Sequence, residues 1–174
     1  DTAELIFENV EIPEENLIGK ENEGFKQVLK ILDGGRIAIA ALSLGIAQGA
    51  IDNSIKYARQ RKQFGKPLSE FQATQFKIAE LATEADAARL LIMKAAVMKD
   101  AGENINTASS MAKLFASELA VKAANEAVQI HGGYGFIKEF PVEKLYRDVK
   151  LVTIGEGTSE VQRMIIAKNL TKLF

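Results

Sequence analysis

Three long stretches of the sequence repeat apolar residues at alternating spacings of three and four, and this pattern constrains the fold more than any other feature. The spacing places each set on one face of a helix. The three sets are Ile37, Ala40, Leu44, Ala47 and Ile51; Ile78, Leu81, Ala85, Ala88, Ile92 and Ala95; and Leu114, Val121, Ala124 and Val128. Because an apolar face must be buried against a neighbour, and alanine lets helix axes approach closely, the stretches predict an antiparallel helical bundle.

Glycine and proline mark the end of the first helix. Gly65 and Pro67 interrupt the helical pattern within "RKQFGKPLSEF". Ser69 is followed three residues later by Gln72, which is the spacing of a capping box. The sequence therefore predicts that the second helix begins there, with the Ser69 side chain as its cap.

The later helices are bounded in the same way. Gly102 ends the second helix, and "HGGYGF" ends the third near His131. A short helical piece over 142–148 and a last helix from about Thr158 follow. We therefore expect an all-α, antiparallel four-helix bundle over residues 20–174.

The N-terminal segment has a different character. "ELIFENVEIP", residues 4–13, alternates like a β-strand, and it is the only good strand pattern in the sequence. A lone strand cannot satisfy its own backbone hydrogen bonds. We therefore interpret residues 1–19 as a β remnant and linker of a preceding middle domain, and the chain as the C-terminal part of a longer protein.

Composition excludes several classes of function. The net charge of −1 and the lack of a basic run argue against nucleic acid as a partner, and no apolar run reaches membrane-spanning length. The sequence has no cysteine, which excludes thiolate chemistry and fits a reducing compartment, either a bacterial cytoplasm, which we prefer, or a mitochondrial matrix. His131 is the only histidine, so we expect no multi-histidine metal site.

One acidic residue stands in an unusual setting. In "LVTIGEGTSEVQRM", Glu156 lies between Gly155 and Gly157, and Thr158 opens a helical pattern. An acid at the start of a helix is favoured by the helix dipole alone. The glycines, however, allow the backbone to approach a flat ligand, and a carboxylate can act as a base. The sequence around Glu156 fits both an acid that stabilises the helix start and a base beside a ligand.

Two further motifs are rich in glycine. "QIHGGYGF", residues 129–136, carries three glycines, whereas a helix stop needs only one, so its backbone is expected to contact a ligand or a partner chain. "LDGGR", residues 32–36, places two glycines inside a helix at a cost of ~1 kcal/mol each, which again indicates a close approach. Its Asp33 and Arg36 could also form a simple surface ion pair.

A basic motif closes the first helix. "RQRKQFGKP" fits a solvated cationic helix end, which complements the helix dipole. Alternatively, Arg61 offers planar donors for a pyrophosphate.

Taken together, these motifs resemble the C-terminal part of the acyl-CoA dehydrogenase family, most closely its short-chain (butyryl-CoA) branch. The resemblance covers nearly the whole chain. It is carried by "FENVEIPEENLIG", "LDGGRIAIAALSLGIAQGAID", "RKQFGKPLSEFQATQF", "MAKLFAS", "QIHGGYGF", "VEKLYRDVK" and "EGTSEVQR". It implies FAD-dependent dehydrogenation of an acyl-CoA thioester to the trans-2-enoyl-CoA, by proton abstraction and hydride transfer to the flavin.

The resemblance also implies roles by position. Glu156 corresponds to the catalytic base, and Gly35 stands where some relatives carry that base instead. The expected substrate-binding residues are Asp33, Arg36 and Gly157. The expected contacts to FAD of a neighbouring subunit are Arg61, Gln63, Phe64, Gln129 and Gly133. Thr158 and Glu160 are expected to contact the flavin of their own subunit.

The implied partners are an acyl-CoA substrate, an electron-transfer flavoprotein and further copies of the chain, as a homodimer or homotetramer. Gly155 departs from the family, which often has tyrosine there, and this affects the expected acyl preference. The family's N-terminal helical domain and most of its β domain have no counterpart here, so the chain alone is expected to retain little FAD and to be inactive.

Three other classes of protein share parts of this pattern. An acyl-CoA oxidase relative is close in chemistry, and a non-catalytic helical assembly module describes the isolated chain. A di-iron carboxylate bundle needs Glu-x-x-His pairs, and Val128 stands three residues before His131, so that class fails.

Overall fold

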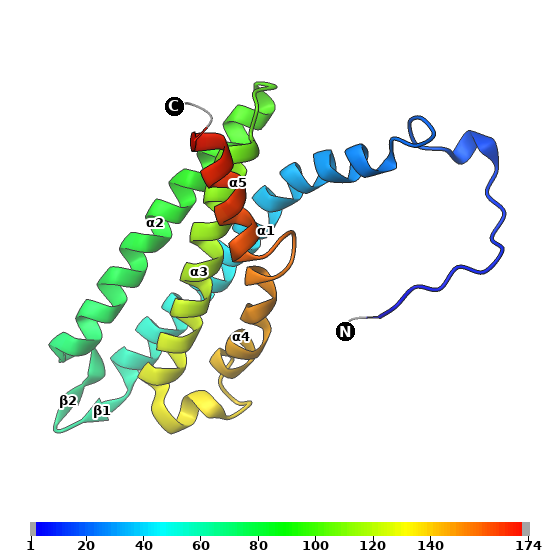
Figure 1. Ribbon diagram of the computed structural model, residues 1–174. Helices are drawn as coiled ribbons and strands as arrows, with labels where there is room; N and C mark the ends of the chain where they lie inside the picture. The colour runs from blue at the N-terminus through cyan, green and yellow to red at the C-terminus, as the bar shows by residue number, and fades with distance from the viewer. Residues whose placement is uncertain (1–2, 172–174) are drawn as a thin grey trace. The chain divides into compact units, whose positions relative to one another are not determined.

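The computed structural model describes residues 3–171, and most of them are helical (Figure 1). The chain divides into two compact units, one ending at Ile31 and one beginning at Leu32. The helix α1 (Gly24–Gln60) begins in the first unit and continues in the second.

The first unit differs from the sequence prediction. Residues 3–13 form no β-strand, and the only regular element before α1 is the 3-10 helix η1 (Glu14–Asn16). Within residues 3–171 the only strands are β1 (Lys62–Gln63) and β2 (Lys66–Pro67), which pair with each other as an antiparallel hairpin. The alternating pattern of residues 4–13 is therefore left without a partner strand, and a strand without a partner has no ladder to form.

The second unit is the predicted all-α antiparallel bundle, which is confirmed. Its further helices are α2 (Gln72–Asp100), α3 (Asn106–His131), α4 (Val142–Asp148) and α5 (Ser159–Thr171). The 3-10 helices η2 (Leu68–Glu70), η3 (Gly132–Phe136) and η4 (Val149–Thr153) connect them. Figure 1 shows α2 and α3 running side by side in opposite directions, and α3 also packs against α4 and α5.

Small side chains dominate the core of the bundle. Alanine supplies most of the buried apolar residues, and α3 alone buries Ala112, Ala116, Ala120, Ala123, Ala124 and Ala127. Two of the buried serines satisfy their hydroxyls within their own helix, because Ser43 and Ser54 each donate to a backbone carbonyl one turn earlier at 2.7 Å. Such a core buries little area per residue, and it lets neighbouring helix backbones come close together.

One predicted helix start is wrong. Ser69 lies inside η2 rather than at the cap of α2, and α2 begins after Phe71 with no side-chain cap. The chain turns through a 3-10 helix directly after Pro67, which moves the start of α2 beyond the reach of the Ser69 hydroxyl. The predicted ends of the second and third helices are confirmed, and Gly102 and Gly132, which follow α2 and α3, have φ angles of +73° and +60°.

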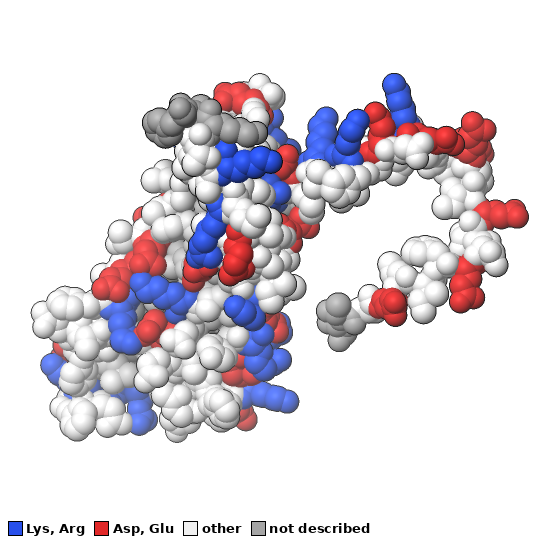
Figure 2. Space-filling model, in the orientation of Figure 1, with Lys and Arg blue, Asp and Glu red and all other residues white. Residues whose placement is uncertain are grey.

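Charges of both signs are mixed over the bundle. On the face shown in Figure 2, lysine and arginine side chains lie among aspartate and glutamate rather than in a single-sign field. Some of these charges join helices: Lys122 of α3 contacts Glu84 of α2 at 2.6 Å, and Arg163 of α5 contacts Glu118 of α3 at 2.9 Å. No helix within residues 3–171 combines the length and the apolar character that crossing a membrane requires.

The alanine core generates a prediction with a built-in control. Ala88 of α2 is fully buried, whereas its neighbour Ala87 is exposed. We expect Ala88→Leu to lower the free energy of unfolding by about 1–3 kcal/mol, because added methylenes force the close-packed helices apart. Ala87→Leu should change it by no more than about 0.5 kcal/mol. Urea unfolding followed by circular dichroism measures both, and equal losses would contradict tight packing at Ala88.

Candidate active site

The motif around Glu156 forms a tight turn between η4 and α5. Glu156 has a φ angle of +56° and Gly157 one of +92°, so two consecutive residues adopt the left-handed conformation. This conformation costs a residue with a side chain roughly 1–2 kcal/mol. A Cβ atom at position 157 would lie 2.9 Å from Nε2 of Gln162, so only glycine fits there without displacing that side chain.

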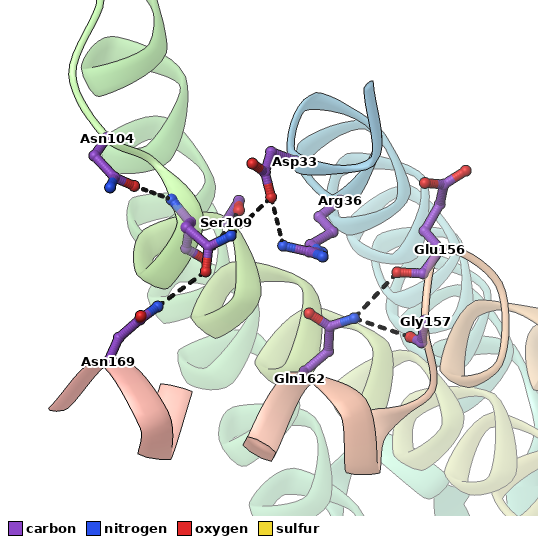
Figure 3. Close-up of polar contacts among 9 residues, drawn as sticks. Asp33, Arg36, Asn104, Ser109, Glu156, Gly157, Gln162 and Asn169 are labelled. Carbon is purple, nitrogen blue, oxygen red and sulfur yellow. Dashed lines mark hydrogen bonds and ion pairs between the residues drawn. The ribbon is translucent and has the colours of Figure 1, made fainter. Parts of the chain in front are cut away.

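Two buried donors hold the carbonyl groups of this turn. Nζ of Lys113 on α3 donates to the Gly157 carbonyl oxygen at 2.8 Å. Nε2 of Gln162 on α5 donates to the carbonyl oxygens of Glu156 at 3.1 Å and of Gly157 at 3.0 Å (Figure 3). Both side chains are completely buried. Sequence reasoning assigned neither of them a role.

The Glu156 carboxylate lies against α1. A Cβ atom at Gly35 would be 2.5 Å from Oε2 of Glu156, so the glycine leaves the space that the carboxylate occupies. This confirms the close approach predicted from the glycines of "LDGGR". The Oε2 atom is buried and has no hydrogen-bond partner among the described residues. A buried carboxylate oxygen without a partner is unusual, and such groups occur at functional sites.

Asp33 and Arg36 belong to a partly buried chain of polar side chains that joins three helices. Nη1 of Arg36 donates to Oδ1 of Asp33 at 2.7 Å, and the Arg36 side chain is only 7% exposed. Asn106 of α3 donates to the same Asp33 oxygen at 3.0 Å and accepts a hydrogen bond from Asn169 of α5 at 2.9 Å (Figure 3). The pair is therefore not a simple surface ion pair, because the Arg36 side chain is buried and Asp33 also accepts a hydrogen bond from α3.

Thr158 and Glu160 lie at the start of α5. The Thr158 hydroxyl accepts a hydrogen bond from the Val161 backbone N–H at 3.4 Å. Hydrogen bonds from its own backbone N–H and from the Thr158 hydroxyl hold the pKa of the exposed Glu160 carboxyl below its usual value. Both residues therefore cap the helix that follows the Glu156 turn.

A second site lies at the other end of α1 and α3. Arg61, Gln63 and Gly133 line a hollow of about 470 Å³, together with Tyr57, His131 and Tyr134 among others. The Arg61 guanidinium lies 5.8 Å from the centre of the Tyr134 ring. The structure thus brings together three of the five residues expected to contact FAD of a neighbouring subunit.

The other two residues of that set lie outside the hollow. Phe64 is 92% exposed at the tip of the β1–β2 hairpin, and its ring centre is 6.3 Å from that of Phe71. Gln129 is exposed on the last turn of α3. Neither is among the residues that line the hollow.

His131 forms a buried wall of this hollow. Its Nδ1 atom lies 2.7 Å from the Ala127 carbonyl oxygen, which can only accept, so Nδ1 carries a proton. The ring stacks on Tyr57 at 4.2 Å. Burial lowers the pKa of His131 below its usual value, against the opposing effect of the Ala127 hydrogen bond. The imidazole is therefore neutral near pH 7.

Within residues 3–171, no three His, Asp or Glu side chains gather as metal ligands would.

Comparison with known proteins places this architecture. Residues 22–171 match the family of acyl-CoA dehydrogenase C-terminal domains. The chain is 56% identical to a probable acyl-CoA dehydrogenase of Bacillus subtilis and 50% identical to subunit CarC of the caffeyl-CoA reductase-Etf complex of Acetobacterium woodii, with 98% of this chain aligned in each case. The structure of butyryl-CoA dehydrogenase from Megasphaera elsdenii superimposes with a TM-score of 0.93 at 45% identity, over 95% of this chain and 43% of that one.

The fold is thus that of the helical domain of acyl-CoA-transforming flavoenzymes. The chain belongs to the acyl-CoA dehydrogenase family and corresponds to its C-terminal domain. The resemblance seen in the sequence, including the likeness to the butyryl-CoA branch, is confirmed. The chain spans 45% of the length of each of the two curated relatives.

The burial of His131 generates a prediction about pH. Because its pKa is lower in the folded state than in the unfolded chain, the unfolded chain binds more protons and stability falls with falling pH. The loss begins near the unfolded pKa of about 6.5 and is complete below the folded pKa. We expect His131→Phe, which keeps an aromatic ring beside Tyr57 but cannot titrate, to lose less stability than the wild type between about pH 7.5 and 5. Thermal unfolding across this range measures the difference, and parallel curves would contradict it.

Proposed function

We propose that this chain is the C-terminal domain of a longer FAD-dependent acyl-CoA dehydrogenase, which oxidises an acyl-CoA thioester to the trans-2-enoyl-CoA. The observation that carries the proposal is the buried, unpartnered Oε2 of Glu156, held in a glycine-flanked turn beside Gly35. A carboxylate oxygen that is shielded from water and free of donors is suited to take a proton.

The chain's own residues supply the acid–base part of this reaction. Glu156 accepts the proton from the carbon alpha to the thioester carbonyl. The Glu156 backbone N–H would donate to the thioester oxygen, which stabilises the charge that develops there. Asp33, Arg36 and the Gly157 backbone line the substrate end of the site, where Arg36 keeps a buried Nε without a partner among the described residues. FAD, when bound, accepts the hydride from the beta carbon.

The hollow beside His131 fits the remote end of FAD. Arg61 offers planar donors for a pyrophosphate, Gly133 lets the backbone approach the ligand, and the aromatic walls suit a flat ring system. We assign this hollow, with the nearby Gln129 and Phe64, to FAD bound mainly by a neighbouring subunit, and Thr158 and Glu160 to the flavin of the same subunit. This assignment implies a homodimer or homotetramer.

One relative supports the expected electron partner. One relative at 50% identity is a subunit of a caffeyl-CoA reductase-Etf complex, which supports an electron-transfer flavoprotein as the acceptor of this enzyme. The same relative favours a second candidate function, that of an enoyl-CoA reductase. Such an enzyme works on the same carbon–carbon bond in the opposite direction. Relatives from bacteria and from mitochondria are both found, and the higher identity to the Bacillus subtilis relative favours a bacterial cytoplasm.

Replacing the base tests the reaction. In the full-length holoenzyme, Glu156→Gln should retain FAD and bind acyl-CoA, but flavin reduction should slow by several orders of magnitude, because an amide cannot accept the proton. Bleaching of the flavin band after anaerobic addition of butyryl-CoA measures the rate. Glu139→Gln, at an exposed glutamate, is the control and should react like the wild type. Near-normal bleaching in the Glu156 variant would refute the assignment.

Replacing Arg61 tests the cofactor hollow. Loss of a charged donor to a phosphate costs about 1.5–3 kcal/mol, so Arg61→Ala should weaken FAD binding roughly ten- to a hundredfold without changing the helical content. Arg59→Ala, at an exposed arginine two residues earlier that does not line the hollow, should bind FAD normally. Titration of the apoprotein with FAD measures both, and unchanged affinity in the Arg61 variant would mean that Arg61 is a solvated helix end.

A further inference from the structure

We propose that Lys113 is a positioning residue for Glu156, because its ammonium group on α3 fixes the Gly157 carbonyl and thereby the turn that carries the carboxylate. The inference rests on the proposed role of Glu156 as the base. It concerns a residue inside the bundle that is assigned no contact with substrate or cofactor.

The setting of Lys113 is costly enough to require an explanation. Lysine is almost never fully buried unless it is paired, yet Lys113 has no exposed surface. Burial lowers the pKa of Lys113, while the charges of Glu118 and Glu156 oppose that shift and Arg36 adds to it. A buried ammonium group is tolerated only where it has a hydrogen-bond partner.

The bond that Lys113 makes leads to the turn and not to an acid. Its Nζ lies 2.8 Å from the Gly157 carbonyl oxygen. The acid one turn further along α3, Glu118, contacts Arg163 instead. The long side chain therefore spans the gap from the centre of the bundle to the backbone beside Glu156.

The turn needs such support because its conformation is strained. Glu156 has a positive φ angle, and such a conformation persists only where its surroundings hold it. Gln162 of α5 donates hydrogen bonds to the carbonyl oxygens of residues 156 and 157, and Lys113 of α3 donates to the carbonyl oxygen of residue 157. Two donors from two different helices fix both the position and the direction of the turn, and so the point at which the carboxylate meets α1 near Gly35.

The test uses the full-length holoenzyme and the variant Lys113→Met, which keeps the length of the side chain but removes the donor. The rate of flavin reduction by acyl-CoA, per bound FAD, should fall about ten- to a hundredfold, since small misplacements of a catalytic group have effects of this size. The Kd for acyl-CoA should change less than about threefold. Lys122→Met, at an exposed lysine on the same helix, should leave both quantities unchanged.

A second measurement does not depend on activity. Hydrogen exchange followed by mass spectrometry should show faster exchange in the segment 151–161 of Lys113→Met, with α2 unchanged. If Lys113→Met yields no folded holoenzyme, Lys113→Gln takes its place, with the same expected loss of rate and gain of exchange, because its shorter side chain cannot span the gap.

The outcomes separate the two proposals. If the wild type shows no flavin reduction by any acyl-CoA, the proposed function fails, whatever the exchange data show. If the wild type is active and the Lys113 variant keeps both its rate per bound FAD and its exchange pattern, Lys113 is not a positioning residue and this inference is overturned.

Discussion

Close packing around α3 is the constraint on which the rest of the structure depends. This helix packs against α2, α4 and α5, and its buried face consists mostly of alanine and serine. Because the neighbouring backbones can come close to α3, side chains from it reach the elements that carry the site. Lys113 reaches the Glu156 turn, and Asn106 reaches both Asp33 of α1 and Asn169 of α5. A bundle with a bulkier core would hold these groups further apart.

The helices were predictable because their periodicity is a local property of the sequence. In each apolar stripe the alanines, among them Ala40, Ala88 and Ala124, are buried as expected, whereas several of the larger members are half-buried. The strand predicted over residues 4–13 is absent, because a strand depends on a partner that its own sequence does not specify. The capping box at Ser69 failed for a different reason: a spacing of three residues fits a helix cap, but the turn after Pro67 decides where the helix begins.

The residues of the candidate site were predictable only where a sequence motif indicated them. Arg61 and Gln63 come from one motif and Gly133 from a distant one, and they meet at one hollow, which reasoning on a single motif could not establish without the family pattern. The burial of Arg36 was hidden, because an Asp–Arg pair one turn apart has the same spacing on a surface as in a core. Lys113 did leave a signal: it stands four residues after Ser109 and three before Ala116, on the buried face of α3. A charge at such a position marks a group that needs a partner.

The contact between Gly35 and Glu156 bears on how this family can vary. A Cβ atom at position 35 would meet the Glu156 carboxylate at 2.5 Å, so the two positions compete for a single volume. In the conformation that Glu156 adopts, its carboxylate occupies the space that a side chain at position 35 would need. The carboxylate of an acid can therefore reach this place from two distant points of the chain, if an acid and a small residue exchange positions together. This overlap gives a steric reason why a relative with an acid at the α1 position would carry a smaller residue in the turn.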